Sequence, residues 1–409
     1  MFLKNTFRAF RHRDYFIFWC GLFLGHTGTL VQVTAQGWLI FQLTNSPFYL
    51  GLDGLCLGLP RVLFSPLGGA VADRMNRRVL FLVTQTTFLL MALSLGVMDY
   101  LGIIRVWHVL IASAITGFFV SFEQPVRQSI VHHLVPRSEL PNAIALYQMV
   151  FNGSALFGPS LGGMLIPFID TKGCFFAAAV GNLIVLLTIF MIRIPATARP
   201  ATPNHLSQDM VEGLTLAWTK PIFLSLFTVL GIVTFCTKPY TQFMPVFARD
   251  ILDVGAPGLG LLLMAPGAGA ILGGLTLASV TRFPKPHHLL LILGAGFGLS
   301  IILFAGSRNF PLSLVCLFFA GGFQTTFLSS TATLLQVHAD ENNRGRIMSL
   351  FGLINRGLGP MGSFPFGIVA TRIGASETVG ICGLLTIGLI GYVLLWHPQL
   401  RDAKPINEI

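Results

Sequence analysis

Long apolar stretches recur along this 409-residue sequence, separated by short connections that carry charges, proline or glycine. About 20 apolar residues in a helix cross the hydrocarbon layer of a bilayer, so each stretch is long enough to span a membrane. Apolar residues make up 53% of the sequence and charged residues only 10%, which excludes an ordinary soluble chain. The sequence therefore predicts an all-α membrane protein with twelve spans, at about 15–42, 48–72, 79–98, 106–128, 140–166, 173–193, 222–247, 257–280, 287–306, 311–335, 346–370 and 377–397.

The positive charges indicate how these helices are oriented. Of the 26 lysines and arginines, 17 fall in the two termini and in the connections after even-numbered spans, whereas five fall in the opposite connections. Lysine and arginine accumulate in cytoplasmic loops, so both termini are predicted to be cytoplasmic. The same distribution explains the net charge of +10 without a nucleic-acid partner, because the cations lie in short loops rather than on one basic face.

A polar segment with several prolines divides the chain into two halves. It covers residues 196–220, and we expect it to be a cytoplasmic linker between six-helix bundles at residues 1–195 and 221–409. An internal repeat supports this division, because Asn142–Gly163 aligns with Asn343–Gly362. Two pseudo-symmetric bundles with a site at their shared midplane are typical of transporters.

The connection between the second and third spans reads GGAVADRMNRR and concentrates four charges. Its glycines allow neighbouring helices to pack closely, and its arginines could reach an acidic group on the fourth span, where Glu123 stands. Alternatively, these charges only orient the hairpin. The residues that we assign to this candidate gating loop are Gly68, Gly69, Asp73, Arg74, Arg77, Arg78 and Glu123.

The fifth predicted span contains a motif of glycine and proline that runs from Gly158 to Gly163. Proline removes a backbone hydrogen bond, and glycines leave a flat surface on which another helix can pack and rock. The residues of this motif that we single out are Gly158, Pro159, Gly162 and Gly163. A purely structural bend is the alternative interpretation.

Several polar residues lie inside predicted spans, where a charge is costly unless it faces a wet cavity, a partner or the interface. We assign a substrate or proton pathway to His26, Gln36, Asp53, Arg61, Lys238, Tyr240 and Arg356. Structural alternatives stay open: His26 could be a packing residue, Asp53 could be solvated, and Arg356 could bond the carbonyls freed by a proline. Glu123 and Arg127 are four residues apart and could neutralise each other.

Enzymatic chemistry finds no support in the sequence. It contains no P-loop, no nucleophile elbow and no cluster of metal-ligand residues, so we expect no enzyme, no cofactor and no metal. The six cysteines are far apart and lie in or beside apolar stretches, where they are interpreted as small core residues.

The connection from Gly68 to Arg78 matches the motif G-x-x-A-D-R-x-x-R-R, and the chain resembles the major facilitator superfamily over nearly its whole length. The motif from Gly158 to Gly163 resembles the core of the antiporter signature G-x-x-x-G-P-x-x-G-G, with the upstream glycine, Gly153, one place early. Five segments resemble the bacterial branch that contains the enterobactin exporter and transmembrane secretion effectors: Gln36–Gly51, Ser65–Arg78, Phe122–Pro136, Glu139–Gly163 and Met244–Leu252.

This resemblance implies two bundles around a central cavity, alternating access by rocking, and energy from the proton gradient. It also implies that the candidate gating loop is a cytoplasmic latch in which Arg77 or Arg78 pairs with Glu123. The expected function is export of a small amphipathic molecule, drug- or siderophore-like, by proton antiport in the bacterial inner membrane. Alternatives are a lipid or lysolipid flippase, an uptake symporter or facilitator, and a receptor that does not transport. The expected partners are this substrate, protons and membrane lipid, and we expect a monomer.

Overall fold

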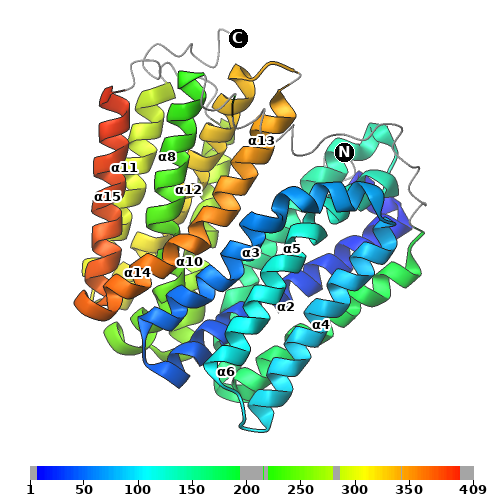
Figure 1. The fold of residues 1–409 in the computed structure, drawn as a ribbon, viewed down its shortest axis with the longest axis horizontal. Coiled ribbons are helices and arrows are strands. Elements are labelled where there is room, and N and C mark those ends of the chain that lie inside the picture. The colour runs from blue at the N-terminus through cyan, green and yellow to red at the C-terminus, as the bar shows by residue number, and fades with distance from the viewer. Residues whose placement is uncertain (1–6, 194–214, 216–219, 280–285, 342, 397–409) are drawn as a thin grey trace. The chain divides into compact units, whose positions relative to one another are not determined.

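The computed structural model describes residues 7–193, 215, 220–279, 286–341 and 343–396 (Figure 1). Within these residues the regular secondary structure is entirely helical. The α-helices are α2 (Arg13–Thr44), α3 (Pro47–Arg74), α4 (Arg77–Tyr100), α5 (Val106–Leu134), α6 (Leu140–Met191), α8 (Pro221–Thr237), α9 (Met244–Val246), α10 (Gly255–Ser279), α11 (Pro286–Gly306), α12 (Phe310–His338), α13 (Arg344–Leu353), α14 (Gly359–Ile373) and α15 (Ala375–Trp396). Three short 3₁₀ helices, η1 (Arg8–Arg11), η2 (Arg137–Glu139) and η3 (Lys238–Phe243), and two π-helices, η4 (Phe247–Ile251) and η5 (Ile354–Leu358), complete the list.

The predicted number of spans agrees with these helices. Ten helical stretches of the described residues are long and apolar enough to cross a membrane. One of them contains α6, whose 52 residues would extend about 78 Å as a straight helix, more than twice the hydrocarbon thickness. A left-handed residue inside α6, Asp170 with φ of 56°, separates two spans. The interrupted run of α13, η5 and α14 supplies one further span, so the expectation of an all-α membrane protein with twelve spans is confirmed.

Two compact units divide the chain, and the first consists of Met1–Thr44, Leu63–Pro203 and Ala256–Met264. In this unit α2 packs along both halves of α6 (Figure 1). Polar side chains of α2 bond directly to α6 backbone: the Tyr15 hydroxyl donates to the Ala143 carbonyl at 2.7 Å, and the Trp19 indole donates to the Leu146 carbonyl at 2.7 Å. These bonds satisfy polar atoms that would otherwise be costly in an apolar setting, and they fix the register of the two helices.

The second unit consists of Asn45–Val62, Asn204–Gly255 and Ala265–Ile409. Its centre is α11, which packs against α12 and α15. The first half of α3 also belongs to this unit and approaches α14 at backbone distance, since a Cβ at Gly54 would lie 2.8 Å from the Pro360 carbonyl oxygen. Small residues are what allow such close helix packing in membranes.

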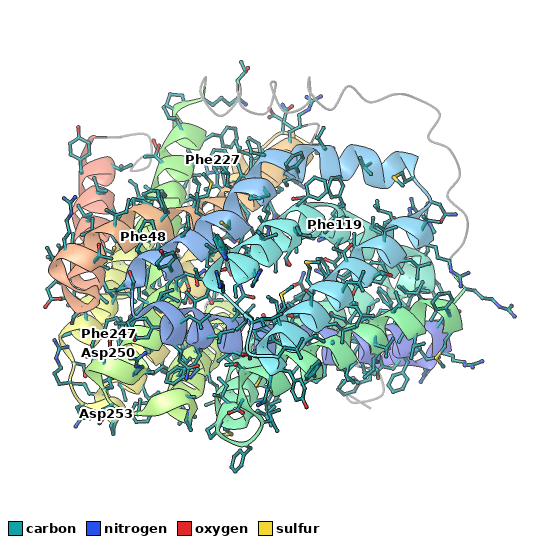
Figure 2. All side chains as sticks on the ribbon, turned by 60° about the horizontal axis from the view of Figure 1, so that its bottom comes forward. Phe48, Phe119, Phe227, Phe247, Asp250 and Asp253 are labelled. Carbon is teal, nitrogen blue, oxygen red and sulfur yellow. The ribbon has the colours of Figure 1, made fainter. Side chains whose placement is uncertain are left out.

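The seventh span, expected at 222–247, is not one continuous α-helix. Helix α8 ends at Thr237 and is followed by the 3₁₀ helix η3, one turn of α-helix and the π-helix η4. Prolines at 239 and 245 lack the N–H that a regular helix needs, which accounts for the irregular run. Figure 2 marks Phe247 and Asp250 in η4, and Asp253 beyond it, where φ is 51°.

The proposed linker, 196–220, lies outside the described residues except for Thr215 and Lys220. The bundle boundaries at 195 and 221 therefore stay a prediction.

Candidate functional site

The candidate gating loop joins α3 to α4, and its backbone packs against α5. A Cβ at Gly68 would collide with the carbonyl oxygen of Ser121, so glycine permits this approach. Pro125 of α5 has no N–H to donate to that same carbonyl, which leaves the oxygen accessible to α3. The side chains of Asp73 and Arg74 and the surroundings of Gly69 lie outside the described part of the structure.

The two later arginines of the loop lie in the first turn of α4. Asn76 caps this helix by accepting a hydrogen bond from the Arg78 backbone N–H at 2.9 Å. Arg77 Nη1 lies 3.0 Å from Nε2 of His133, at the end of α5, and the guanidinium of Arg78 lies over the ring of Phe190 at 5.8 Å. The expected contact of Arg77 or Arg78 with Glu123 stays a prediction.

A buried ion pair lies further along α5. Arg127 Nη1 donates to Glu123 Oε1 at 2.7 Å, and the two side chains are only 13% and 6% exposed. This is the i,i+4 pair that the sequence allowed. The same guanidinium also contacts α6. Its Nε donates to the Tyr147 hydroxyl at 2.7 Å, and its central carbon lies 4.5 Å from the centre of the Phe151 ring.

His26 of α2 borders the same cluster. Its ring meets the ring of Phe151 edge to face, with centroids 4.7 Å apart. In the next position Thr27 donates to Ser154 Oγ at 3.1 Å, which fixes α2 against α6 at this height. The fold thus brings the pathway candidate His26 near Glu123, which was assigned to the candidate gating loop and is far from His26 in the sequence. We call the set of His26, Glu123, Arg127, Tyr147 and Phe151 the charged cluster.

Sequence reasoning missed Tyr147 and Phe151 as members of the charged cluster. Both aromatic residues lie in a predicted span, where they resemble ordinary packing residues. One signal was available, because they are four residues apart and so occupy one face of the helix.

The glycines of the fifth span lie where two helices approach α6. A Cβ at Gly158 would be 2.5 Å from Leu30 Cβ, and one at Gly162 would be 3.2 Å from Val31 Cα, both in α2. A Cβ at Gly163 would be 2.5 Å from the Ala256 carbonyl oxygen in α10. The flat surface that was predicted around Pro159 is therefore in contact with α2 on one face and with α10 on another.

The other pathway candidates are distributed over several helices. In the first unit, Gln36 Nε2 donates to Ser113 Oγ at 2.8 Å and so joins α2 to α5. In the second unit, Asp53 is 7% exposed, which disfavours the interpretation that it is simply solvated. Tyr240 is buried beside Phe297, and the side chain of Lys238 lies outside the described residues.

Two arginines of the second unit occupy neighbouring helices. Arg61 lies in α3 and Arg356 in the π-helix η5. The backbone of Gly357 packs directly on Val62, since a Cβ at this glycine would collide with the valine side chain. Arg61 and Arg356 directly precede the two residues of this contact, so their backbones lie close together in space. In addition, π-helical turns are frequent at functional sites.

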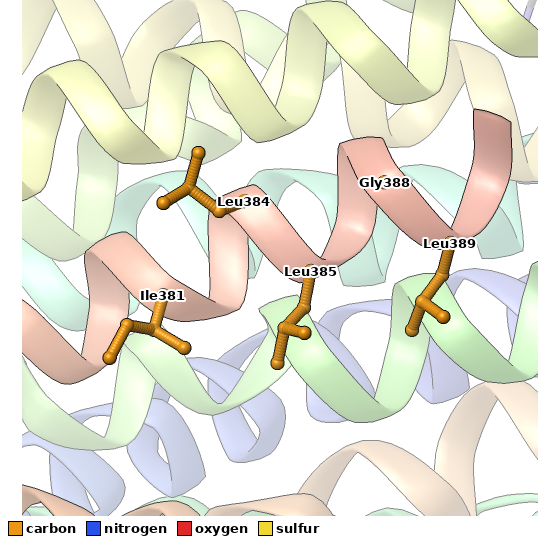
Figure 3. A pocket seen from close by; sticks show the side chains of 5 residues that line it. All are labelled: Ile381, Leu384, Leu385, Gly388 and Leu389. Atoms are coloured by element: carbon orange, nitrogen blue, oxygen red, sulfur yellow. The ribbon is translucent and has the colours of Figure 1, made fainter. Parts of the chain in front are cut away.

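One pocket of the described residues, on α15, is lined by none of the candidate residues. This shallow apolar notch of about 280 Å³ is lined by Ile381, Leu384, Leu385, Gly388 and Leu389 (Figure 3). It offers no polar group that could orient a ligand. No group of three or more His, Cys, Asp or Glu side chains that could hold a metal ion occurs among the residues that the structure describes.

Comparison with solved structures identifies the class of fold. The nucleoside transporter NupG superposes with a TM-score of 0.74 at 14% identity, over 95% of this chain and 98% of that one. A bacterial homologue of the lysosomal transporter Spinster superposes with a TM-score of 0.71 at 16% identity, over 96% and 98% of the two chains. The chain therefore has the fold of major facilitator transporters.

The sequence profile of the transmembrane secretion effectors matches residues 4–408. The chain belongs to this family of the major facilitator superfamily, and it is a multi-pass membrane transport protein.

Curated relatives cover nearly the whole chain. The multidrug efflux pump Tap of Mycolicibacterium fortuitum is 24% identical over 92% of this chain and 93% of its own length. The staphyloferrin A transporter of Staphylococcus aureus is 22% identical, over 90% and 93%. The enterobactin exporter EntS of Salmonella typhimurium is 25% identical, over 94% and 92%. Relatives of this chain thus move small molecules across membranes.

Proposed function

We propose that this protein exports a small amphipathic molecule, drug- or siderophore-like, by proton antiport with alternating access. The observation that carries the proposal is the Glu123–Arg127 ion pair, buried in the fourth span. A carboxylate in such a place is costly unless it is paired or protonated. Glu123 is therefore ionised while it is paired with Arg127, and it can take up a proton when the transport cycle separates the pair, which is the minimum that proton coupling requires.

The charged cluster allows both states. When Glu123 is ionised, it accepts the hydrogen bond from Arg127, and the pair is neutral. When Glu123 takes up a proton, the Tyr147 hydroxyl and the Phe151 ring still contact Arg127, but the guanidinium has lost its counter-ion, so this state requires Arg127 to move towards water or an anionic group. Proton uptake would change the charge of the cluster and thereby its affinity for substrate.

The direction and class of substrate are supported by the relatives. One is a multidrug efflux pump and another exports enterobactin, and both cover more than nine tenths of this chain. We assign the protein to the bacterial inner membrane, as a monomer with both termini cytoplasmic. The six-helix bundles would be residues 1–195 and 221–409, joined by the linker, and the loop Gly68–Arg78 would be a latch on the cytoplasmic side.

Transport by purified protein in proteoliposomes tests this function. An imposed pH gradient and a panel of lipophilic cations, siderophores and lysolipids would be combined with a pH-sensitive dye enclosed in the vesicles. We expect at least one amphipathic compound to move against protons. Movement together with protons would identify a symporter, movement without a proton signal a facilitator, and movement of lysolipids alone a flippase, and each would overturn antiport.

The proton site is tested by Glu123→Gln, with Asp170→Asn as the matched control, because Asp170 is 69% exposed and the change removes a carboxylate while keeping the size of the side chain. We expect Glu123→Gln to abolish the proton signal and Asp170→Asn to leave it intact. If Glu123→Gln, Asp53→Asn and His26→Ala each leave the signal unchanged, these three residues do not carry the proton.

A further inference from the structure

The last turn of α5 presents a histidine to the candidate gating loop. His133 Nδ1 donates to the Ser129 carbonyl at 2.8 Å, as a side chain can do to the residue four positions earlier in a helix. Arg77 Nη1 lies 3.0 Å from Nε2 of the same ring and 3.3 Å from Nδ1. A carbonyl only accepts, so Nδ1 carries the hydrogen. Arg77 Nη1 lies at nearly the same distance from both ring nitrogens, so it packs against the ring rather than in line with the Nε2 lone pair. This arrangement requires a neutral His133.

A proton on Nε2 would end this contact, because it would place two positive charges in direct contact. Histidine is the side chain whose charge changes between pH 5 and 8. The contact is therefore present while His133 is neutral and lost when the ring takes up a proton.

Arg77 depends on this partner because of where it lies. It is the first residue of α4, at the positive end of the helix dipole, where a cation is disfavoured. Arg78 follows it and lies over the Phe190 ring. Other ionisable groups of this corner include Asp73 and Arg74, which end α3 and whose side chains lie outside the described residues, and His132 of α5 itself. His132 Nδ1 bonds the Gln128 carbonyl, one position before that used by His133.

We propose that His133 makes the candidate gating loop responsive to pH on its own side of the membrane. Neutral His133 holds Arg77 against α5, and charged His133 releases Arg77, which is then available to an acidic partner. The effect of this contact on transport rests on the proposed gating role of the loop, whereas the contact itself does not. The contact and its release are properties of α4 and α5 alone.

A spin label in the loop tests the release directly. Met75 is 43% exposed and lies two residues before Arg77, so a label at this position reports the mobility of the loop. The label would be attached in a background without the six native cysteines, in lipid nanodiscs, and its spectrum recorded from pH 8 to pH 5. We expect an immobilised component at pH 8 that is lost as the pH falls.

Three variants assign the response. His133→Gln keeps a neutral side chain and should remove the pH dependence, and His133→Arg should give the mobile spectrum at every pH. His132→Gln is the matched control, because the neighbouring histidine has the same backbone bond without the contact to Arg77, and it should behave as the unmodified protein. A spectrum that does not change with pH, or that changes equally in His133→Gln, overturns the proposal.

Transport in proteoliposomes separates this inference from the proposed function. If the label responds through His133 while the pH dependence of transport is the same in His133→Gln and in the unmodified protein, the histidine contact is correct and the gating role of the loop is wrong. If the label ignores His133, the inference fails whatever the transport result.

Discussion

The guanidinium of Arg127 lies 4.5 Å from the centre of the Phe151 ring, so that a charge on α5 is covered by an aromatic face on α6. A cation over an aromatic face is stabilised by roughly 0.5–2 kcal/mol, and more so when water is excluded. The same guanidinium is bonded to Glu123 and Tyr147. The charged cluster therefore connects the two helices as well as offering a proton site, and its parts can be tested for stability independently of transport.

Removal of Glu123 should destabilise the protein strongly. Glu123→Gln leaves Arg127 buried without its counter-ion, and breaking a buried pair in this way costs about 3–5 kcal/mol. Denaturant unfolding in detergent micelles measures the change. The double variant Glu123→Gln/Arg127→Met should recover much of the loss, because no charge is left unpaired. Asp170→Asn, which removes one partner of an exposed ion pair, is the control. If Glu123→Gln is as stable as this control, the Glu123–Arg127 pair does not contribute to stability.

Loss of one hydroxyl should have a smaller effect. Tyr147→Phe removes the acceptor of the Arg127 Nε bond but keeps the ring, so we expect a loss of about 1.5–3 kcal/mol, as for hydrogen bonds to charged groups. The control is Tyr100→Phe, since Tyr100 is 68% exposed and should be insensitive. The same unfolding assay distinguishes the two, and equal stability of both variants would mean that the Arg127–Tyr147 bond contributes nothing.

Close packing of α6 on α2 predicts that Gly158 tolerates no side chain. Gly158→Ala places a methyl group 2.5 Å from Leu30 Cβ, and overpacking of this kind costs about 1–3 kcal/mol. Gly274→Ala is the matched control, because a Cβ there meets no atom within 4 Å, and alanine favours a helix by up to ~1 kcal/mol over glycine. Opposite signs of the two changes in thermal stability are expected; a stabilised Gly158→Ala would refute the close approach.

The latch role of the loop predicts that Asp73→Asn slows transport without affecting membrane insertion. We expect a reduction on the order of tenfold, which corresponds to about 1.4 kcal/mol. Initial rates in proteoliposomes, normalised to the amount of inserted protein, provide the measurement. Asp250→Asn, in the π-helix η4, is the control acid. Transport that is unchanged by Asp73→Asn would leave the loop with an orienting role only.

The topology of the chain makes a further prediction. Green fluorescent protein fused after residue 409 should fluoresce in the cytoplasm. Alkaline phosphatase fused after Asp170 should be active, and after Arg137 inactive, because successive connections alternate between the two sides. The reverse pattern of activity would invert every assignment of side made above.

The number and type of spans were predictable because apolar length is a local property of sequence. The boundaries were less so: the connection expected between 166 and 173 proved to be almost continuous helix, with a single left-handed residue at Asp170 as the break. Likewise, Pro239 and Pro245 are incompatible with a regular α-helix through the seventh span, but they do not predict that 3₁₀ and π turns follow one another there. Such choices depend on packing against neighbouring helices.

Contacts between distant segments were the hardest to predict. The Glu123–Arg127 pair followed from a spacing of four residues. The contribution of Tyr147 and Phe151 could not be derived, since an aromatic residue in a span has many apolar neighbours with which to pack. The partner of Arg77 could not be derived either, because several acidic residues or a histidine could bind its guanidinium. In this structure Arg77 contacts His133.

The π-helix η5 has a consequence for comparing this chain with its relatives. A π turn closes its hydrogen bonds over five residues instead of four, so it holds one residue more than the α-helix around it. A relative with an uninterrupted α-helix at this place must be aligned with a one-residue gap near Arg356. Without the gap, every later position of that span would be rotated by about 100° around the helix axis, and residues facing the lipid would be equated with residues facing the protein interior.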